Sequence, residues 1–93
     1  MFKDLIAVYP AIFKPEKEGG YFIDFPDLEG VFTGINENDV AFGMQMASEV
    51  LGLMLSEFIK NGTKFNDPSP VNSVAHDEDS FVTLVVTDIK KYL

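Results

Sequence analysis

Residues 19–33 read GGYFIDFPDLEGVFT, and this stretch decides the fold. Gly19 and Gly20 supply the backbone freedom that a tight reversal of the chain needs. Large apolar residues then alternate around an aspartate, as they do in a half-buried strand. Pro26 has no amide hydrogen to give to a strand ladder, and Gly30 can take the positive φ of a turn. The stretch therefore predicts a strand, a turn and the start of a second strand at the centre of a small sheet.

The predicted sheet extends on both sides of this stretch. Residues 5–13 are apolar at both alternating sets of positions, which predicts a strand that is central or covered on two faces. Pro10 in its middle indicates either a bend or an edge that lacks a ladder partner there. A charged loop at residues 14–20 leads back as a hairpin into a strand at residues 21–25, and a third strand follows at residues 31–35. Three consecutive strands with short connections predict an antiparallel meander.

A long helix is predicted after the meander, from about residue 37 to about residue 60. Asn36 is the expected N-cap, with Asp39 three residues later in the manner of a capping box, and Gly62 is expected just beyond the last turn. A single apolar stripe follows the helical repeat, formed by Val40, Met44, Ala47, Leu51, Met54 and Phe58.

Further apolar residues flank this stripe, so the apolar surface of the helix is wider than one contact with a sheet needs. Gly43 and Gly52 indicate that another backbone or side chain approaches the helix closely. The pattern predicts self-association as a dimer or a tetramer; the alternative is that the following loop covers the surplus. The residues assigned to this interface are Phe42, Met46, Val50 and Leu53 of the helix, with Phe81 and Val85 of the last strand.

The remainder of the chain predicts a fourth strand. Residues 63–79 contain two prolines and an acidic run, which indicate a long extended connection. Residues 80–88 alternate as a strand whose place after the helix permits a parallel pairing with the first strand. Asp88 is placed to cap a short final helix at residues 89–93. The fold class is α+β: a three-stranded antiparallel meander, one long helix and then a fourth strand.

The charge balance restricts the possible partners. The chain of 93 residues has a formal charge of -8, with 15 acidic residues, and all seven of its basic residues are lysines. Nucleic-acid binding needs a high density of cations, so this chain is expected not to bind nucleic acid directly. An acidic surface suits a basic protein partner; the alternative is that the acidity only keeps the domain in solution. The lack of cysteine and of a recognisable signal sequence favours the cytoplasm, and the apolar runs are too short for a bilayer.

No residue pattern predicts catalysis, a metal or a cofactor. A two-metal nuclease of the ribonuclease H type needs a carboxylate in the middle of its first strand, and residues 7–10 contain none. Asp24, Asp27 and Glu29 lie close together in the sequence, but three acids near a turn are more typical of a solvated surface. His76 is the single histidine and has no cysteine or second histidine near it in the sequence. The prediction is a non-catalytic module.

Four motifs in this order resemble the amino-terminal domain of HicB-type antitoxins. They are YPAIF at residues 9–13, GGY at 19–21, FPDLEG at 25–30, and FT at 32–33 followed by the helix. The resemblance covers nearly the whole chain and implies one domain over residues 1–93. It also implies a partial ribonuclease H-like fold, β-β-β-α-β, without the nuclease residues. Many such antitoxins continue into a DNA-binding domain, which is not expected within these residues, so operator binding is not carried over.

The resemblance implies an antitoxin that binds a small basic HicA-type mRNA interferase and neutralises it sterically. Asp24, Asp27 and Glu29 are the candidates for charge complementarity with the toxin, and Tyr21 or Phe22 is the candidate aromatic anchor. The alternative for the two aromatic residues is ordinary cross-strand packing. A second hypothesis is a self-assembling structural or sensory module of the same fold that acts without a toxin.

Overall fold

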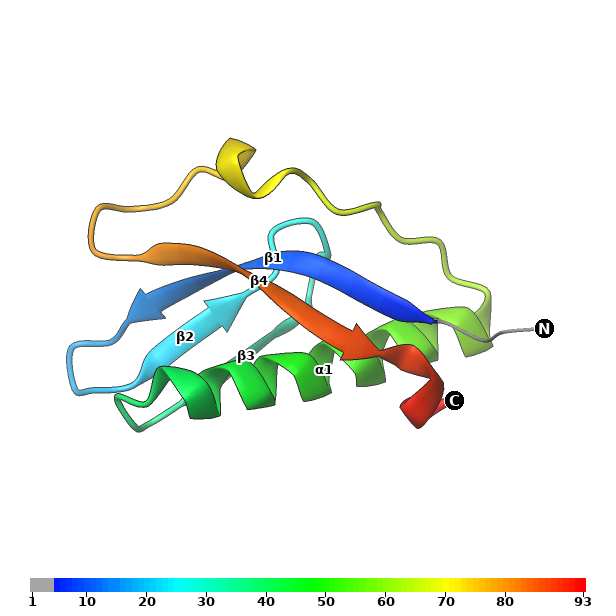
Figure 1. Cartoon of the computed structure of the whole chain (residues 1–93), viewed down its shortest axis with the longest axis horizontal. Coiled ribbons are helices and arrows are strands. Elements are labelled where there is room, and N and C mark those ends of the chain that lie inside the picture. The colour runs from blue at the N-terminus through cyan, green and yellow to red at the C-terminus, as the bar shows by residue number, and fades with distance from the viewer. Residues whose placement is uncertain (1–4) are drawn as a thin grey trace.

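The computed structural model describes residues 5–93, which form one sheet with a helix on one side (Figure 1). The elements are β1 (Ile6–Pro15), β2 (Tyr21–Asp24), β3 (Phe32–Ile35), α1 (Val40–Asn61), β4 (Phe81–Asp88) and the 3₁₀ turns η1 (Val71–Ser73) and η2 (Ile89–Tyr92). The long connection between α1 and β4 runs along the side of the sheet that faces away from α1. The predicted α+β fold class and order of elements are confirmed.

The sheet has the order β3-β2-β1-β4, and every neighbouring pair is antiparallel. The suggested parallel pairing of the fourth strand with the first is wrong, because β4 pairs with β1 from Phe13↔Phe81 to Ile6↔Asp88. The reason lies in the connection after α1. It carries the chain back along the length of the sheet, so β4 enters from the end opposite to the one that a parallel crossover would reach (Figure 1).

Pro10 lies where β1 has a neighbour on one side alone. It is paired with Leu84 of β4, whereas the register between β1 and β2 begins at Ile12. The second of the two alternatives drawn from this proline, an edge without a ladder partner, is therefore confirmed. A proline is tolerated there because no neighbouring strand needs its missing N–H group.

The core lies between the sheet and α1. Its largest fully buried side chains are Phe13 and Phe25 from the sheet side, packed in the same cluster as Leu51 and Leu55 of the helix. The close approach expected at Gly52 is confirmed, since a Cβ atom there would lie 2.3 Å from a ring carbon of Tyr92 and 2.6 Å from Oγ1 of Thr87. Part of β1 is also covered on its other face, where Pro10 and Ile12 are buried.

The helix begins later than predicted. The N-cap is Asp39 and not Asn36, and Oδ1 of Asp39 accepts a hydrogen bond from the amide of Phe42 at 3.1 Å. The residues just before the cap are held by the β1–β2 hairpin, because Oδ1 of Asn38 accepts from the amide of Gly20 at 2.8 Å. This bond fixes a non-helical segment between β3 and α1 that the local pattern did not reveal.

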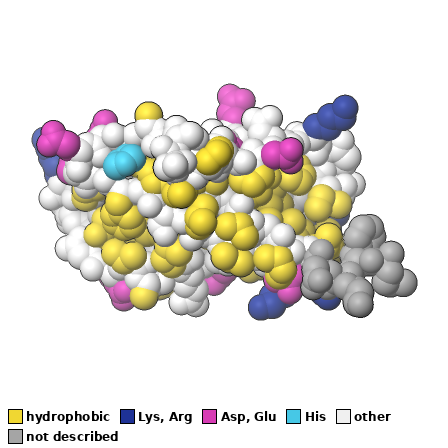
Figure 2. Space-filling model, turned by 45° about the horizontal axis from the view of Figure 1, so that its top comes forward, with side chains coloured by type: hydrophobic (Ala, Val, Ile, Leu, Met, Phe, Trp, Pro, Cys, Tyr) yellow, Lys and Arg dark blue, Asp and Glu magenta, His cyan; other side chains and the backbone are white. Residues whose placement is uncertain are grey.

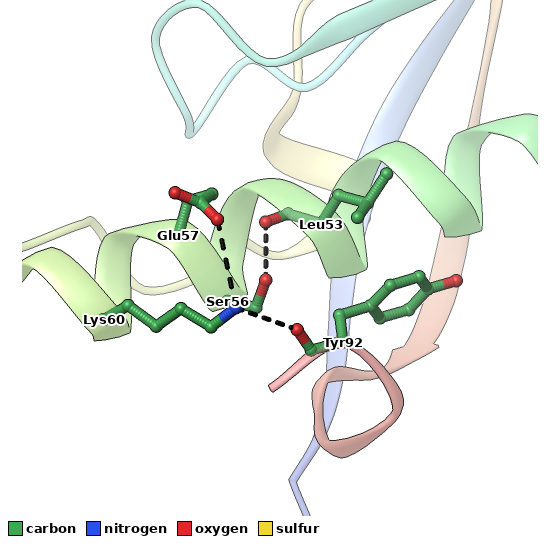
Figure 3. Close-up of polar contacts among 5 residues, drawn as sticks. All are labelled: Leu53, Ser56, Glu57, Lys60 and Tyr92. Atoms are coloured by element: carbon green, nitrogen blue, oxygen red, sulfur yellow. Dashed lines mark hydrogen bonds and ion pairs between the residues drawn. The ribbon is translucent and has the colours of Figure 1, made fainter.

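The predicted C-terminal end of α1 and the predicted cap of the final short helix are confirmed. Gly62 follows α1 with a left-handed φ of 69°, and Asp88 accepts a hydrogen bond from the amide of Lys90 at the start of η2. Figure 3 shows how η2 is held against the helix: Nζ of Lys60 donates to the carbonyl of Tyr92 at 3.3 Å and lies 4.0 Å from a carboxylate oxygen of Glu57. These contacts fix the end of the chain beside the last turns of α1.

Candidate partner-binding site

The residues predicted to bind a toxin lie in three different environments. Tyr21 points toward the helix layer and is half-buried, with its ring centroid 5.7 Å from that of Phe13 and 6.1 Å from that of Phe81. Both ring contacts are edge-on, a favourable arrangement for aromatic packing. These contacts favour the packing alternative for Tyr21.

Phe22 and Asp24 lie on the opposite face of the sheet, which α1 does not cover. The ring of Phe22 lies 5.5 Å from that of Phe32, and Nζ of Lys14 lies 5.5 Å from the centroid of Phe22. Asp24 is directly opposite Phe32 in the register of β2 and β3. Phe22 is opposite Gly34, which has no side chain to cover that flank of the ring.

Phe32 is the residue of this surface that sequence reasoning missed. Its side chain is 53% exposed, the most exposed aromatic ring of the described residues. The signal was present in the alternation, because Val31 and Ile35 are buried and the residue between them at Phe32 must face the other way. Phe22, Phe32 and Asp24 form what we call the aromatic face.

Asp27 and Glu29 lie in the turn between β2 and β3, next to the aromatic face. Glu29 is exposed, whereas the carboxylate of Asp27 is half-buried and engaged within the chain. Its two oxygens accept from the amide of Ser69 at 2.8 Å and from Oγ of Ser69 at 2.5 Å. Asn66 donates to the carbonyl of Asp27 at 3.1 Å. Asp27 therefore holds the long connection to the turn.

Tyr9 continues this hydrogen-bonded group into the core. Its hydroxyl donates to the carbonyl of Asn66 at 2.6 Å, and its ring is buried. Burial raises the pKa of Tyr9, and the charges of Asp67 and Asp27 raise it further. The neutral hydroxyl is therefore the form that this environment favours.

A shallow hollow of about 270 Å³ lies beside the same turn. Its walls come from the turn, from the last turns of α1 and from the start of the long connection: Asp27, Leu28, Glu29, Phe58, Thr63, Lys64, Phe65 and Asn66. The rings of Phe58 and Phe65, both in its wall, have their centroids 5.7 Å apart and are tilted by 33° to each other. Within residues 5–93 no three His, Cys, Asp or Glu side chains are grouped so that they could hold a metal ion.

The residues predicted for self-association are also divided by the structure. Phe42 and Leu53 are exposed on α1, and Met46 and Val50 are half-buried. The exposure expected for the side of the last strand that carries Phe81 and Val85 is wrong, because Val85 is fully buried and Phe81 stacks on Phe13 at 4.9 Å. The alternation of β4 was identified, but its two faces were assigned the wrong way round.

The exposed apolar side of the last strand is the one that carries Leu84 and Val86. Together with Ile6 and Val8 of β1 they form what we call the β1–β4 strip, on the face of the sheet away from α1. Figure 2 turns the upper side of Figure 1 toward the viewer and shows hydrophobic side chains gathered across the middle of the molecule in this view.

Two further features bear on function. The side chain of His76 is exposed, and its Nδ1 lies 2.9 Å from the carbonyl oxygen of Asp77 and 3.3 Å from Oγ of Ser80. Both contacts lie within the loop that carries His76.

Among the described residues, no helix combines the length and the apolar character that a membrane crossing requires.

Three known proteins that this chain resembles in sequence or in fold come from toxin-antitoxin systems. No protein-family model matches the chain. The antitoxin HicB 1 of Photorhabdus laumondii subsp. laumondii is 32% identical over 63 residues, which are 68% of this chain and 39% of that protein. The match thus spans about two fifths of the length of that relative.

Solved structures extend the match to nearly the whole chain. A chain of a toxin-antitoxin complex from Streptococcus pneumoniae is 28% identical and superposes with a TM-score of 0.82 over 96% of this chain and 74% of that one. A chain of a HicA3 and HicB3 toxin-antitoxin complex, at 22% identity, supports the fold with a TM-score of 0.70 over 87% of this chain and 98% of that one. In sequence and in fold, this chain is therefore HicB-like, as its motifs predicted.

Proposed function

We propose that this chain is an antitoxin domain that binds a small basic HicA-type ribonuclease and neutralises it by covering its RNA-binding surface. The observation that carries the proposal is the close likeness to a chain of a toxin-antitoxin complex, with a TM-score of 0.82 over 96% of the chain. The charge of -8 adds to it, because a strongly acidic domain accelerates its encounter with a basic protein and competes with RNA phosphates for the same cations.

The binding surface that we assign to the toxin combines the aromatic face with the adjoining turn. Phe32 and Phe22 supply rigid, partly exposed rings, which are frequent anchors in interfaces. Asp24, Asp27 and Glu29 supply negative charge around them. Tyr21 has a lesser part in this assignment, because its ring is already packed between Phe13 and Phe81.

The proposed inhibition is steric and needs no chemistry from this chain. A toxin cation that contacts Asp24 or Glu29 is no longer available to an RNA phosphate, and the rings beside these acids exclude water from the contact. Asp27 contributes mainly by holding the turn in place, since both of its carboxylate oxygens are hydrogen-bonded to Ser69.

The test is co-purification with the small basic HicA-type protein encoded next to this chain, followed by an assay of its ribonuclease activity. We expect inhibition at low salt, and Phe32→Ala is expected to weaken binding at least tenfold. The matched control is Phe42→Ala, which removes another exposed aromatic ring, one that lies on α1, and it should bind like the unchanged chain. A lack of binding at low ionic strength, where electrostatic attraction is strongest, would contradict the proposal.

A second candidate function is a self-assembling structural or sensory module without a toxin. The observation that favours it is the exposed β1–β4 strip, which lies away from the acidic turn and needs no basic partner. If the chain assembles with itself and leaves the activity of the neighbouring basic protein unchanged, this second function replaces the first.

A further inference from the structure

We propose that the hollow beside the β2–β3 turn receives the side chain of an arginine from the protein that this chain binds. The proposal deepens the proposed function and rests on it, because the basic toxin is the partner that supplies the arginine. It extends the toxin-binding surface from the aromatic face across the turn to the end of α1. Glu29 of the turn and the rings of Phe58 and Phe65 form the site.

The size of the hollow favours a single side chain over a free ligand. Its volume of about 270 Å³ is below the roughly 300–1,000 Å³ of pockets that enclose small molecules. The hollow is also shallow, so its walls cannot surround a free molecule. A side chain that projects from the surface of a protein partner fits such a space, because the rest of the interface holds it there.

Two aromatic rings form the apolar wall of the hollow. Phe58 lies in the last turns of α1 and is half-buried, whereas Phe65 follows the helix and is 37% exposed. The face of an aromatic ring attracts a cation, and the planar guanidinium of arginine also stacks on it. The exposed ring of Phe65 is therefore the surface on which we place the guanidinium.

The acidic wall of the hollow comes from the turn. The carboxylate of Asp27 is already bonded to Ser69, whereas that of Glu29 is exposed and forms no hydrogen bond or ion pair with any of residues 5–93. A carboxylate accepts two parallel N–H bonds from a guanidinium, which the ammonium group of a lysine cannot offer in that geometry. Glu29 is therefore the residue that pairs with the incoming arginine.

Hydrogen bonds hold the two walls in place before a partner binds. Asn66 donates to the carbonyl of Asp27 at 3.1 Å and so joins the start of the long connection to the turn. The amide of Thr63 donates to the carbonyl of Phe58 at 2.8 Å, which fixes the chain between the two rings. A site that is formed in advance loses less conformational entropy when it binds.

Lys64 also lines the hollow and gives a prediction of opposite sign. Its ammonium group forms no ion pair with Asp27 or Glu29. A positive charge near the site weakens the binding of a second cation, so Lys64→Gln should strengthen the binding of arginine about twofold. The matched control is Lys17→Gln, which removes the same charge from the β1–β2 hairpin at the other end of α1 and should have no effect.

The direct test is an NMR titration of the full chain with N-acetyl-arginine amide, compared with N-acetyl-citrulline amide, an uncharged probe of similar shape. The arginine probe should shift the amide signals of residues 27–29 and 63–66, with an affinity about fivefold higher than that of the citrulline probe. Glu29→Gln and Phe65→Leu should each remove this preference. Equal binding of the two probes, shifts spread evenly over the acidic surface, or no shifts at all would overturn the proposal.

Two matched controls accompany the titration, with circular dichroism to establish that each variant is folded. Phe42→Leu replaces a ring that is also 37% exposed but lies in the first turn of α1. Glu18→Gln removes an exposed carboxylate from the β1–β2 hairpin. Both variants should keep the preference for arginine. Glu29→Gln changes only an exposed side chain, so it remains informative if Phe65→Leu fails to fold.

Binding of the neighbouring basic protein separates this proposal from the proposed function. Glu29→Gln and Phe65→Leu should each weaken that binding about fivefold, and the double variant should lose less than the sum of the two losses in binding free energy, because both residues contact one arginine. If both variants bind like the unchanged chain, the arginine site is rejected while the antitoxin function stands. If the unchanged chain does not bind the toxin but the titration shows the arginine preference, the proposed function is wrong and the hollow takes its arginine from another protein.

Discussion

Asp27 and Ser69 are 42 residues apart in the sequence and are joined by two hydrogen bonds, from the Ser69 amide to Oδ2 at 2.8 Å and from its Oγ to Oδ1 at 2.5 Å. Hydrogen bonds to a carboxylate are stronger than those between neutral groups. This pair therefore joins the long connection between α1 and β4 to the turn at the proposed binding surface.

Removing the carboxylate should loosen that connection measurably. We expect Asp27→Ala to lower the free energy of unfolding by about 2 kcal/mol and Ser69→Ala by about 1 kcal/mol, because the amide bond survives in the second variant. Urea denaturation measures both. Asp67→Ala is the matched control, an exposed acid two residues before Ser69, and it should change stability by less than about 0.5 kcal/mol. Strictly additive losses in the Asp27→Ala/Ser69→Ala double variant would contradict a direct coupling.

Two turn glycines allow the cost of backbone strain to be measured separately from the cost of a steric clash. Gly20 and Gly30 have nearly the same φ, 83° and 82°. A Cβ atom at Gly20 would lie 2.0 Å from the carbonyl oxygen of Ile35, whereas at Gly30 nothing lies within 4 Å. We expect Gly30→Ala to cost about 1 kcal/mol from backbone strain alone, and Gly20→Ala to cost more than about 3 kcal/mol. Thermal or urea unfolding of the two variants checks this, and equal losses would show that the hairpin moves to accept the methyl group.

The sequence was sufficient for the order of the elements, though not for the direction in which β4 pairs with β1, because each junction carries its own local signal. The glycine pair at Gly19 and Gly20, the proline at Pro26 and the left-handed Gly62 each mark an end within a few residues of where the structure has it. The family motifs depend on the same residues, which is why the resemblance and the local pattern agreed.

Other features were beyond a local pattern because they depend on distant contacts. Alternation divides β4 into two sets of side chains, but the set that faces α1 is decided by the packing of Val85 into the core. The start of α1 is set by Asn38, which is held by Gly20, 18 residues earlier. The exposed ring of Phe32 and the bond between Asp27 and Ser69 likewise became visible only once β2, β3 and the connection were placed together.

The raised pKa of Tyr9 predicts a loss of stability in alkali. Burial, with the charges of Asp67 and Asp27, holds the proton on the folded protein to a higher pH than in the unfolded chain, where tyrosine titrates near 10. The contribution of Tyr9 is therefore fully present below about pH 10 and is lost as the pH rises from there through the higher pKa of the folded state. Tyr9→Phe should cost about 1 kcal/mol at pH 7, because it removes the hydrogen bond to Asn66.

The difference in stability between the unchanged chain and Tyr9→Phe should then shrink above about pH 10. Urea unfolding in a series of buffers from pH 8 to pH 11 measures it, and other groups that titrate in this range affect both proteins alike. A difference that stays constant over the series would mean that the hydroxyl ionises equally easily in the folded and unfolded chains.

The last prediction concerns the cap of α1, where sequence and structure name different residues. Oδ1 of Asp39 accepts a hydrogen bond from the amide of Phe42, while Asn36 is exposed and outside the helix. Asp39→Ala should therefore lower the free energy of unfolding by about 1 kcal/mol, because an amide of the first turn loses its acceptor and a favourable charge near the helix N-terminus is removed. Asn36→Ala should have an effect below about 0.5 kcal/mol. Thermal unfolding at low ionic strength compares the two, and a greater loss in Asn36→Ala would place the cap where the sequence pattern had it.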